Sequence, residues 1–64
     1  MSAAMTIDED TKTRVRRRAV HYILESVVRE TGCSIHDLTQ LAHGGWPALT
    51  ERQWFLLARR MHLV

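Results

Sequence analysis

The chain of 64 residues contains few residues that interrupt a helix: one proline and three glycines, Pro47, Gly32, Gly44 and Gly45. They fall at two places and therefore divide the sequence into three segments. No stretch shows the strict alternation of polar and apolar residues that is typical of a half-buried strand. The sequence predicts a small all-α domain of three helices over residues 7–64, preceded by a flexible N-terminus at residues 1–6.

Cysteine is also scarce. The single thiol, Cys33, leaves no partner for an intramolecular disulfide, which favours a reducing compartment over secretion. No apolar run approaches the ~20 residues of a membrane span. The first ten residues, "MSAAMTIDED", are acidic where a secretion signal would be basic. We therefore expect a cytoplasmic protein that does not bind membranes.

Catalytic and metal-binding motifs are absent as well. There is no Gly-rich phosphate loop, no G-x-S-x-G and no pair of carboxylates, and a chain this short has little room for an enclosed pocket of ~300 Å³. Cys33 and His36 have a C-x-x-H spacing and His43 follows, but a structural zinc site needs a second close pair of ligands. We expect a non-enzyme with no cofactor and no metal.

The first and longest helix is predicted to begin at Thr6 and to end at Thr31. Thr6 and Glu9 have the T-x-x-E spacing of a capping box, and Gly32 supplies the left-handed residue that commonly ends a helix. Together with Tyr22, two neighbouring apolar stripes cover an arc of about 240° at about 100° per residue. The stripes comprise Val15, Ala19, Ile23 and Val27, and Val20, Leu24 and Val28. Two short helices cannot cover an arc so wide.

Two shorter helices follow, and each has a clear start. Ser34 and Asp37 form a capping box for the second helix, which ends at His43, and Thr50 and Gln53 form one for the third. The residues expected to face the core are Ile35, Leu38, Leu41 and Ala42 in the second helix, and Trp54, Leu57, Ala58, Met61 and Val64 in the third. These spacings predict amphipathic helices that pack on the first.

Surplus apolar surface on the first and third helices is the basis of the main functional hypothesis. Exposed apolar patches usually mark an interface, and a two-fold homodimer is the commonest way for a small chain to bury one. The expected protein-interface residues are Val20, Tyr22, Leu24, Phe55 and Leu56. The hypothesis is a small regulatory adaptor or inhibitor that binds a protein partner and forms a homodimer.

Clustered arginines give a second hypothesis. The net charge of +2 does not by itself imply nucleic acid, but "RVRRR" occupies residues 14–18. The candidate nucleic-acid contacts are Arg14, Arg17, Arg18, Arg59 and Arg60. The first three share a helix face that could neutralise two or three phosphates. The other interpretation is a solvated face whose arginines pair with Asp10 and Glu25. The alternative function is thus a nucleic-acid-binding transcription regulator.

Two further residues have specific expectations. Arg16 projects toward the apolar stripe near Ile23, so its head must reach solvent or meet an acidic group across an interface. Trp46 precedes Pro47 and is expected to fold the connecting loop onto the core. Both residues bear on how the loop after the second helix is held.

Two blocks of the sequence resemble the Cro and phage-repressor class of helix-turn-helix domains. "RETGCSIHDLTQLA", 29–42, is similar to the end of helix one and the whole of helix two of that class, and "PALTERQWFLLARRMHLV", 47–64, to its last helix. The blocks cover about half of the chain. In that class the segment between them holds the turn and the recognition helix, but here only "HGGW", 43–46, stands there. The resemblance implies a repressor-like scaffold that lacks its recognition helix.

Overall fold

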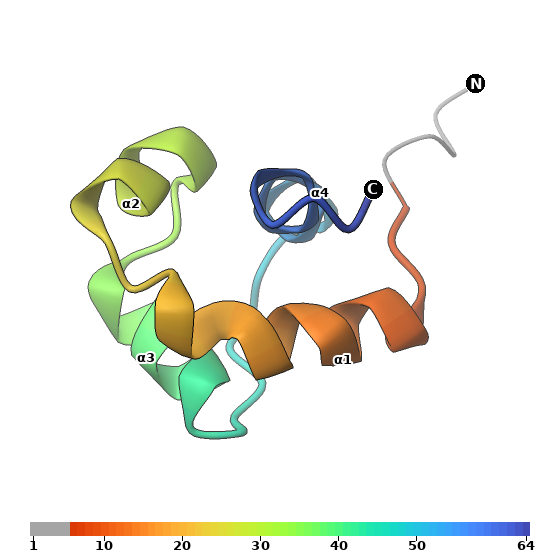
Figure 1. The fold of residues 1–64 in the computed structure, drawn as a ribbon, viewed down its shortest axis with the longest axis horizontal. Helices are drawn as coiled ribbons and strands as arrows, with labels where there is room; N and C mark the ends of the chain where they lie inside the picture. The colour runs from red at the N-terminus through yellow and green to blue at the C-terminus, as the bar shows by residue number, and fades with distance from the viewer. Residues whose placement is uncertain (1–5) are drawn as a thin grey trace.

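The computed structural model describes residues 6–64 and is entirely helical, with no strand in that range. Its elements are α1 (Glu9–Arg18), a short 3-10 helix η2 (Ala19–His21), α2 (Glu25–Thr31), α3 (Ile35–Ala42) and α4 (Glu51–Arg60) (Figure 1). The all-α class is confirmed, but the count of three helices is wrong, because these residues form four α-helices. The flexible N-terminus expected at residues 1–6 lies, except for Thr6, outside the described residues.

The segment expected to form one long helix is divided in two. After η2, Tyr22 has φ −127° and Leu24 is extended with φ −133° and ψ 147°, so α2 begins anew at Glu25. No glycine or proline stands at this break. The break lets Val15 and Val27, on opposite sides of it, both become fully buried. The chain itself therefore covers much of the wide apolar arc.

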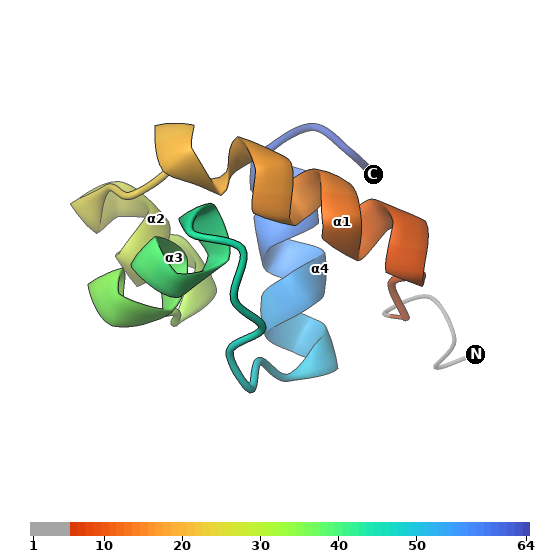
Figure 2. The same ribbon diagram turned by 90° about the horizontal axis from the view of Figure 1, so that it is seen from below.

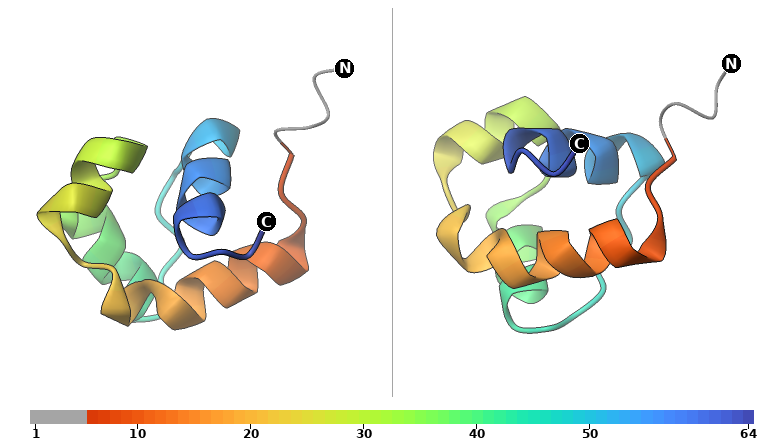
Figure 3. Two further views of the ribbon diagram at one scale, coloured as in Figure 1. Left: turned by 45° about the horizontal axis from the view of Figure 1, so that its top comes forward. Right: turned by 45° about the vertical axis from the view of Figure 1, so that its right-hand side comes forward.

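The helices pack around one core. α1 packs against α3 and α4, η2 against α3, and α2 against α4. Figure 2 shows α4 running across α1, and Figure 3 shows α2 and α4 on the same side of α1. The buried apolar residues are Ile7, Val15, Ala19, Val27, Cys33, Leu38, Leu41, Trp54, Leu57, Ala58 and Met61. None of the helices between residues 6 and 64 is both long and apolar enough to cross a membrane.

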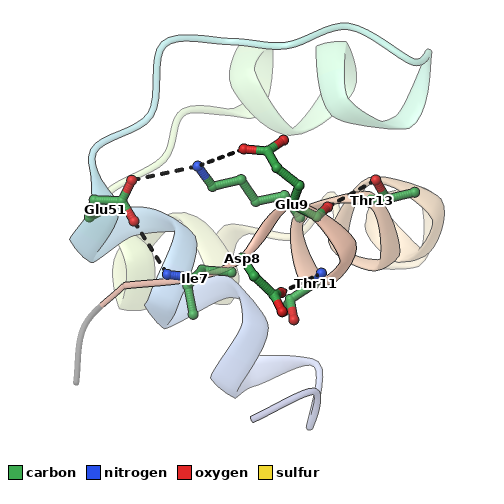
Figure 4. A network of polar contacts seen from close by, with 7 residues as sticks. Ile7, Asp8, Glu9, Thr11, Thr13 and Glu51 are labelled. Atoms are coloured by element: carbon green, nitrogen blue, oxygen red, sulfur yellow. Dashed lines mark hydrogen bonds and ion pairs between the residues drawn. The ribbon is translucent and has the colours of Figure 1, made fainter. Parts of the chain in front are cut away.

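The first helix starts later than the sequence pattern indicates. Asp8 is its N-cap, and one carboxylate oxygen accepts the backbone N–H of Thr11 at 2.9 Å (Figure 4). Thr6 was expected in this role, but Ile7 is buried and its N–H donates to the Glu51 carboxylate at 3.4 Å. This contact with α4 fixes the chain before α1, so the first turn of helix forms after Asp8.

The other two predicted helix starts are confirmed, since both hydrogen bonds of the capping box are present at Ser34–Asp37 and at Thr50–Gln53. Two residues expected to face the core do not. Ile35 is 40% exposed, and Val64 is 60% exposed because α4 ends at Arg60. The remaining inward residues of the last helix, Trp54, Leu57, Ala58 and Met61, are buried as predicted.

Candidate nucleic-acid interface

A three-residue turn joins α2 to α3 and is held by hydrogen bonds from both sides. Gly32 has φ +77°, the left-handed value expected of it. The Thr31 hydroxyl donates to the Val27 carbonyl at 2.7 Å and accepts the N–H of Cys33 at 3.2 Å. From α4, the side-chain amide of Gln53 donates to the Gly32 carbonyl. The turn is therefore fixed both to α2 and to the last helix.

The two faces of α3 have different chemistry. Leu38 and Leu41 are fully buried and attach the helix to the core. His36, Gln40 and His43 are exposed, and their spacings of four and three residues place them on one face. α3 therefore lies on the surface of the domain and presents a stripe of polar, uncharged or weakly basic side chains to the solvent.

The polar side chains of α3 differ in whether they form hydrogen bonds within the protein. The side-chain hydrogen bonds found on α3 within residues 6–64 involve neither His36 nor the Gln40 amide. Nδ1 of His43 lies 2.8 Å from the carbonyl oxygen of Thr39. Because a carbonyl oxygen can only accept, Nδ1 carries a proton, and no hydrogen bond within residues 6–64 engages Nε2. The Asp37 carboxylate is occupied by the capping box.

Arg17 is the predicted nucleic-acid contact that lies beside α3. It is exposed on α1, and no ion pair or hydrogen bond engages its side chain within the described part of the chain. The open groove that it borders runs between α1 and the C-terminal end of α3 and is lined by Thr13, Arg16, Arg17, Leu41, Ala42 and Gly44. Its guanidinium is thus available to a ligand that covers α3.

The other four predicted arginines are placed elsewhere or paired. Arg14 pairs with Asp10 at 3.2 Å, as the alternative interpretation of the basic face expected, and Arg18 donates to the Met61 carbonyl at 3.3 Å. Arg60 pairs with Glu30 at 3.0 Å. Arg59 lies with Arg60 in a second groove, which is lined by Glu30, Leu56, Arg59, Arg60 and His62. This groove lies at α2 and α4 and shares no lining residue with the groove beside α3.

Arg16 meets neither solvent alone nor an acidic group, contrary to the expectation from the sequence. Its guanidinium donates to the carbonyl oxygens of Gly44 and Gly45 and lies over the Trp46 ring, 4.0 Å from the ring centroid. The Trp46 ring in turn packs on the Trp54 ring, with 5.9 Å between the two ring centroids. Trp46 is nevertheless 53% exposed, so it covers the core only in part. These contacts fix the loop that follows α3.

The five predicted protein-interface residues differ in exposure. Val20 and Leu24 are 57% and 46% exposed and flank the break before α2. Tyr22 and Phe55 are half-buried against the core, and the Arg60 guanidinium lies 5.4 Å from the Tyr22 ring centroid. Leu56 is half-buried and lines the groove between α2 and α4. Of these five residues, only Val20 and Leu24 are exposed.

Cys33 and His36, which have a C-x-x-H spacing, differ in their surroundings. Cys33 is fully buried, and burial raises the pKa of its thiol above the ordinary value of 9.0, whereas His36 faces solvent. Among residues 6–64, no three His, Cys, Asp or Glu side chains come together in a way that could hold a metal ion.

Comparisons with protein-family models, with curated proteins and with solved structures found no match. The exposed stripe of His36, Gln40 and His43 was not among the residues predicted from the sequence. Its signal was nevertheless present, since these positions lie opposite the inward stripe of Leu38 and Leu41 on a helical wheel. These positions become a candidate binding surface only because α2 and α3 are separate helices joined by a short turn.

Proposed function

We propose that this protein is a helix-turn-helix DNA-binding domain in which α3 enters the major groove. The observation that carries this proposal is the three-residue turn, with left-handed Gly32, that joins α2 to a surface helix. Two helices linked by a turn of three or four residues that often contains glycine are typical of the motif. The second helix of such a pair supplies the side chains that reach base edges. In α3 these are His36, Gln40 and His43.

With α3 as the recognition helix, the resemblance to the Cro and phage-repressor class applies to different helices than the sequence pattern indicated. The hypothesis of a missing recognition helix assumed that residues 29–31 end one long first helix. The break at residues 22–24 makes α2 a separate helix, so α2 and α3 correspond to the two helices of the motif. "HGGW", 43–46, then belongs to the loop between α3 and α4 and leaves the motif complete.

Phosphate contacts would come from residues beside α3, because α3 contains no lysine or arginine. Arg17 borders the groove at the C-terminal end of α3 and has no competing ion pair in the described residues. Phosphate contacts position a protein on the duplex, whereas base contacts give specificity. With so few free cations next to α3, we expect an affinity that depends on salt through a small number of phosphates.

The test is fluorescence anisotropy with a labelled pool of random duplexes over a range of salt concentrations. We expect wild-type protein to bind at low salt. Arg17→Ala should weaken binding to all duplexes alike and lower the salt slope by about 1, because one phosphate contact is lost. Arg59→Ala is the matched control, since that arginine lies in the groove between α2 and α4. No binding at low salt, or equal effects of the two variants, would contradict the proposal.

A regulatory protein–protein contact is the second candidate, favoured by the exposure of Val20 and Leu24. Contiguous exposed apolar surface usually marks an interface, and these two residues lie only four positions apart in the chain. A second copy bound there would give a two-fold dimer, the form in which helix-turn-helix domains present two recognition helices to two half-sites. Sedimentation equilibrium of wild type and Val20→Glu tests it, with Val64→Glu as control because Val64 is similarly exposed. A wild-type monomer that captures no partner rejects this candidate.

A further inference from the structure

We propose that α3 selects a site with an adenine opposite Gln40 and a thymine methyl group against Ile35. This inference rests on the proposed DNA-binding function and deepens it from DNA binding to a base preference. It depends on which polar groups of α3 are free, which are occupied and which apolar side chain is left exposed.

Gln40 is the group on α3 best suited to read a base edge. Its side chain is exposed between His36 and His43, and no hydrogen bond within residues 6–64 engages its amide. Its own carbonyl accepts the N–H of Gly45 at 2.7 Å, so the backbone from which the amide projects is fixed. An amide has a donor and an acceptor side by side, which matches N7 and the N6 amino group of adenine in the major groove.

The groups that would favour other bases are missing from α3 or occupied. Guanine is most often read by arginine or lysine, and α3 has neither. Cytosine is read by a carboxylate, but Oδ2 of Asp37, the one acidic residue of α3, accepts the N–H of Ser34 at 3.2 Å, which holds the group at the N-terminal end of the helix.

Ile35 provides an apolar contact at the start of the same helix. It is the first residue of α3 and 40% exposed, although Leu38 and Leu41 of this helix are fully buried. Apolar side chains in the major groove recognise thymine through its C5 methyl group. The capping box at Ser34 and Asp37 fixes the first turn, so the position of Ile35 relative to Gln40 is set by the helix itself.

The experiment begins with selection of bound sequences from random duplexes by wild-type protein. In the selected site, each adenine is replaced in turn by an analogue with carbon in place of N7, and each thymine by uracil, which lacks the methyl group. We expect one adenine replacement to weaken wild-type binding roughly tenfold and one uracil replacement to weaken it by a smaller factor, about threefold. These replacements remove single atoms or groups from the DNA and leave the protein unchanged.

The variants assign each effect to its residue. Gln40→Ala should be insensitive to the adenine analogue and Ile35→Ser insensitive to uracil, because each has lost the contact concerned. Arg59→Ala should keep both sensitivities, and circular dichroism melting verifies that every variant is folded. Wild-type binding without an adenine preference, or a Gln40→Ala protein that keeps the full analogue effect, overturns this inference and leaves DNA binding standing. A wild-type protein that binds no duplex overturns the proposed function as well.

Discussion

Gln53 joins the start of α4 to the turn between α2 and α3. Its Nε2 donates to the carbonyl oxygen of Gly32 at 3.1 Å, and its Oε1 accepts the N–H of Thr50 at 2.9 Å. One amide thus completes a capping box and holds a turn that is 21 residues away in the sequence. The orientation of α3 relative to α4 depends in part on this side chain.

Two substitutions of Gln53 separate these roles. Gln53→Glu keeps an oxygen that can accept from Thr50 but removes the donor to Gly32, so it should reduce the free energy of unfolding by about 1 kcal/mol. Gln53→Ala loses both hydrogen bonds and should cost about 2 kcal/mol. Urea denaturation followed by tryptophan fluorescence measures both. A Gln53→Glu protein as stable as wild type would show that the bond to Gly32 contributes nothing, and equal stabilities of the two variants would show the same for the bond to Thr50.

Gly32 is a second point at which the turn can be tested. Its φ of +77° lies in the left-handed region, and an added Cβ would meet only the Gln53 amide, at 3.9 Å. The penalty for Gly32→Ala is therefore conformational and should be about 1 kcal/mol. Gly32→Asn should cost less, because asparagine tolerates the left-handed conformation. Thermal melting ranks the stabilities of the two variants. If Gly32→Ala were more stable than Gly32→Asn, strain in the left-handed conformation would not be the cause.

Val27 tests the bend between α1 and α2. The side chain is fully buried only because the chain turns at residues 22–24 and brings α2 onto α4. Val27→Ala should lower the free energy of unfolding by about 2 kcal/mol, from lost apolar burial and a residual cavity. Val20→Ala is the matched control, since that side chain is 57% exposed and its loss should change stability by less than about 0.5 kcal/mol. In one long helix the two valines would not be expected to differ so strongly.

Asp8 gives a prediction for acid solution. Hydrogen bonds from the Thr11 hydroxyl, and then from its backbone N–H, lower the pKa of the Asp8 carboxyl below its ordinary value of 3.8. A lowered pKa means that the contribution to stability is complete above 3.8 and is lost as pH falls through the folded-state value. The melting temperature of wild type should therefore fall further on acidification than that of Asp8→Asn. Thr11→Val removes only the hydroxyl bond and keeps the backbone N–H donor, so its loss of melting temperature on acidification should lie between those of wild type and Asp8→Asn. Parallel wild-type and Asp8→Asn curves would contradict the prediction.

Local sequence patterns correctly predicted the helix starts whose caps consist of hydrogen bonds between side-chain and backbone atoms three residues apart. Ser34 with Asp37 and Thr50 with Gln53 form the predicted capping boxes, whose atoms all belong to one short segment. Thr6 had the same spacing with Glu9, yet the burial of Ile7 moved the cap to Asp8. A capping pattern thus predicts a start only where no tertiary contact fixes the chain beside it.

The candidate site was less predictable than the fold class. Arg17 was expected to contact nucleic acid, and the groove beside α3 is consistent with that role. Arg60 belonged to the same expected patch, but its pairing with Glu30 depends on the packing of α2 against α4. The pattern gives the face of a helix on which an arginine lies but leaves open which neighbouring helix that face meets.

Three features of residues 6–64 were predictable without the structure: the all-helical class, the left-handed residue at Gly32, and the two helices that follow it. They depend on short-range hydrogen bonds and on the period of apolar residues. The division of the first apolar segment into two helices depends instead on packing between distant parts of the chain. No residue at 22–24 forbids a continuous helix, but a straight one would leave its wide apolar arc in water. Bending buries Val15 and Val27 in one core and makes α2 a separate helix, joined to α3 by a three-residue turn.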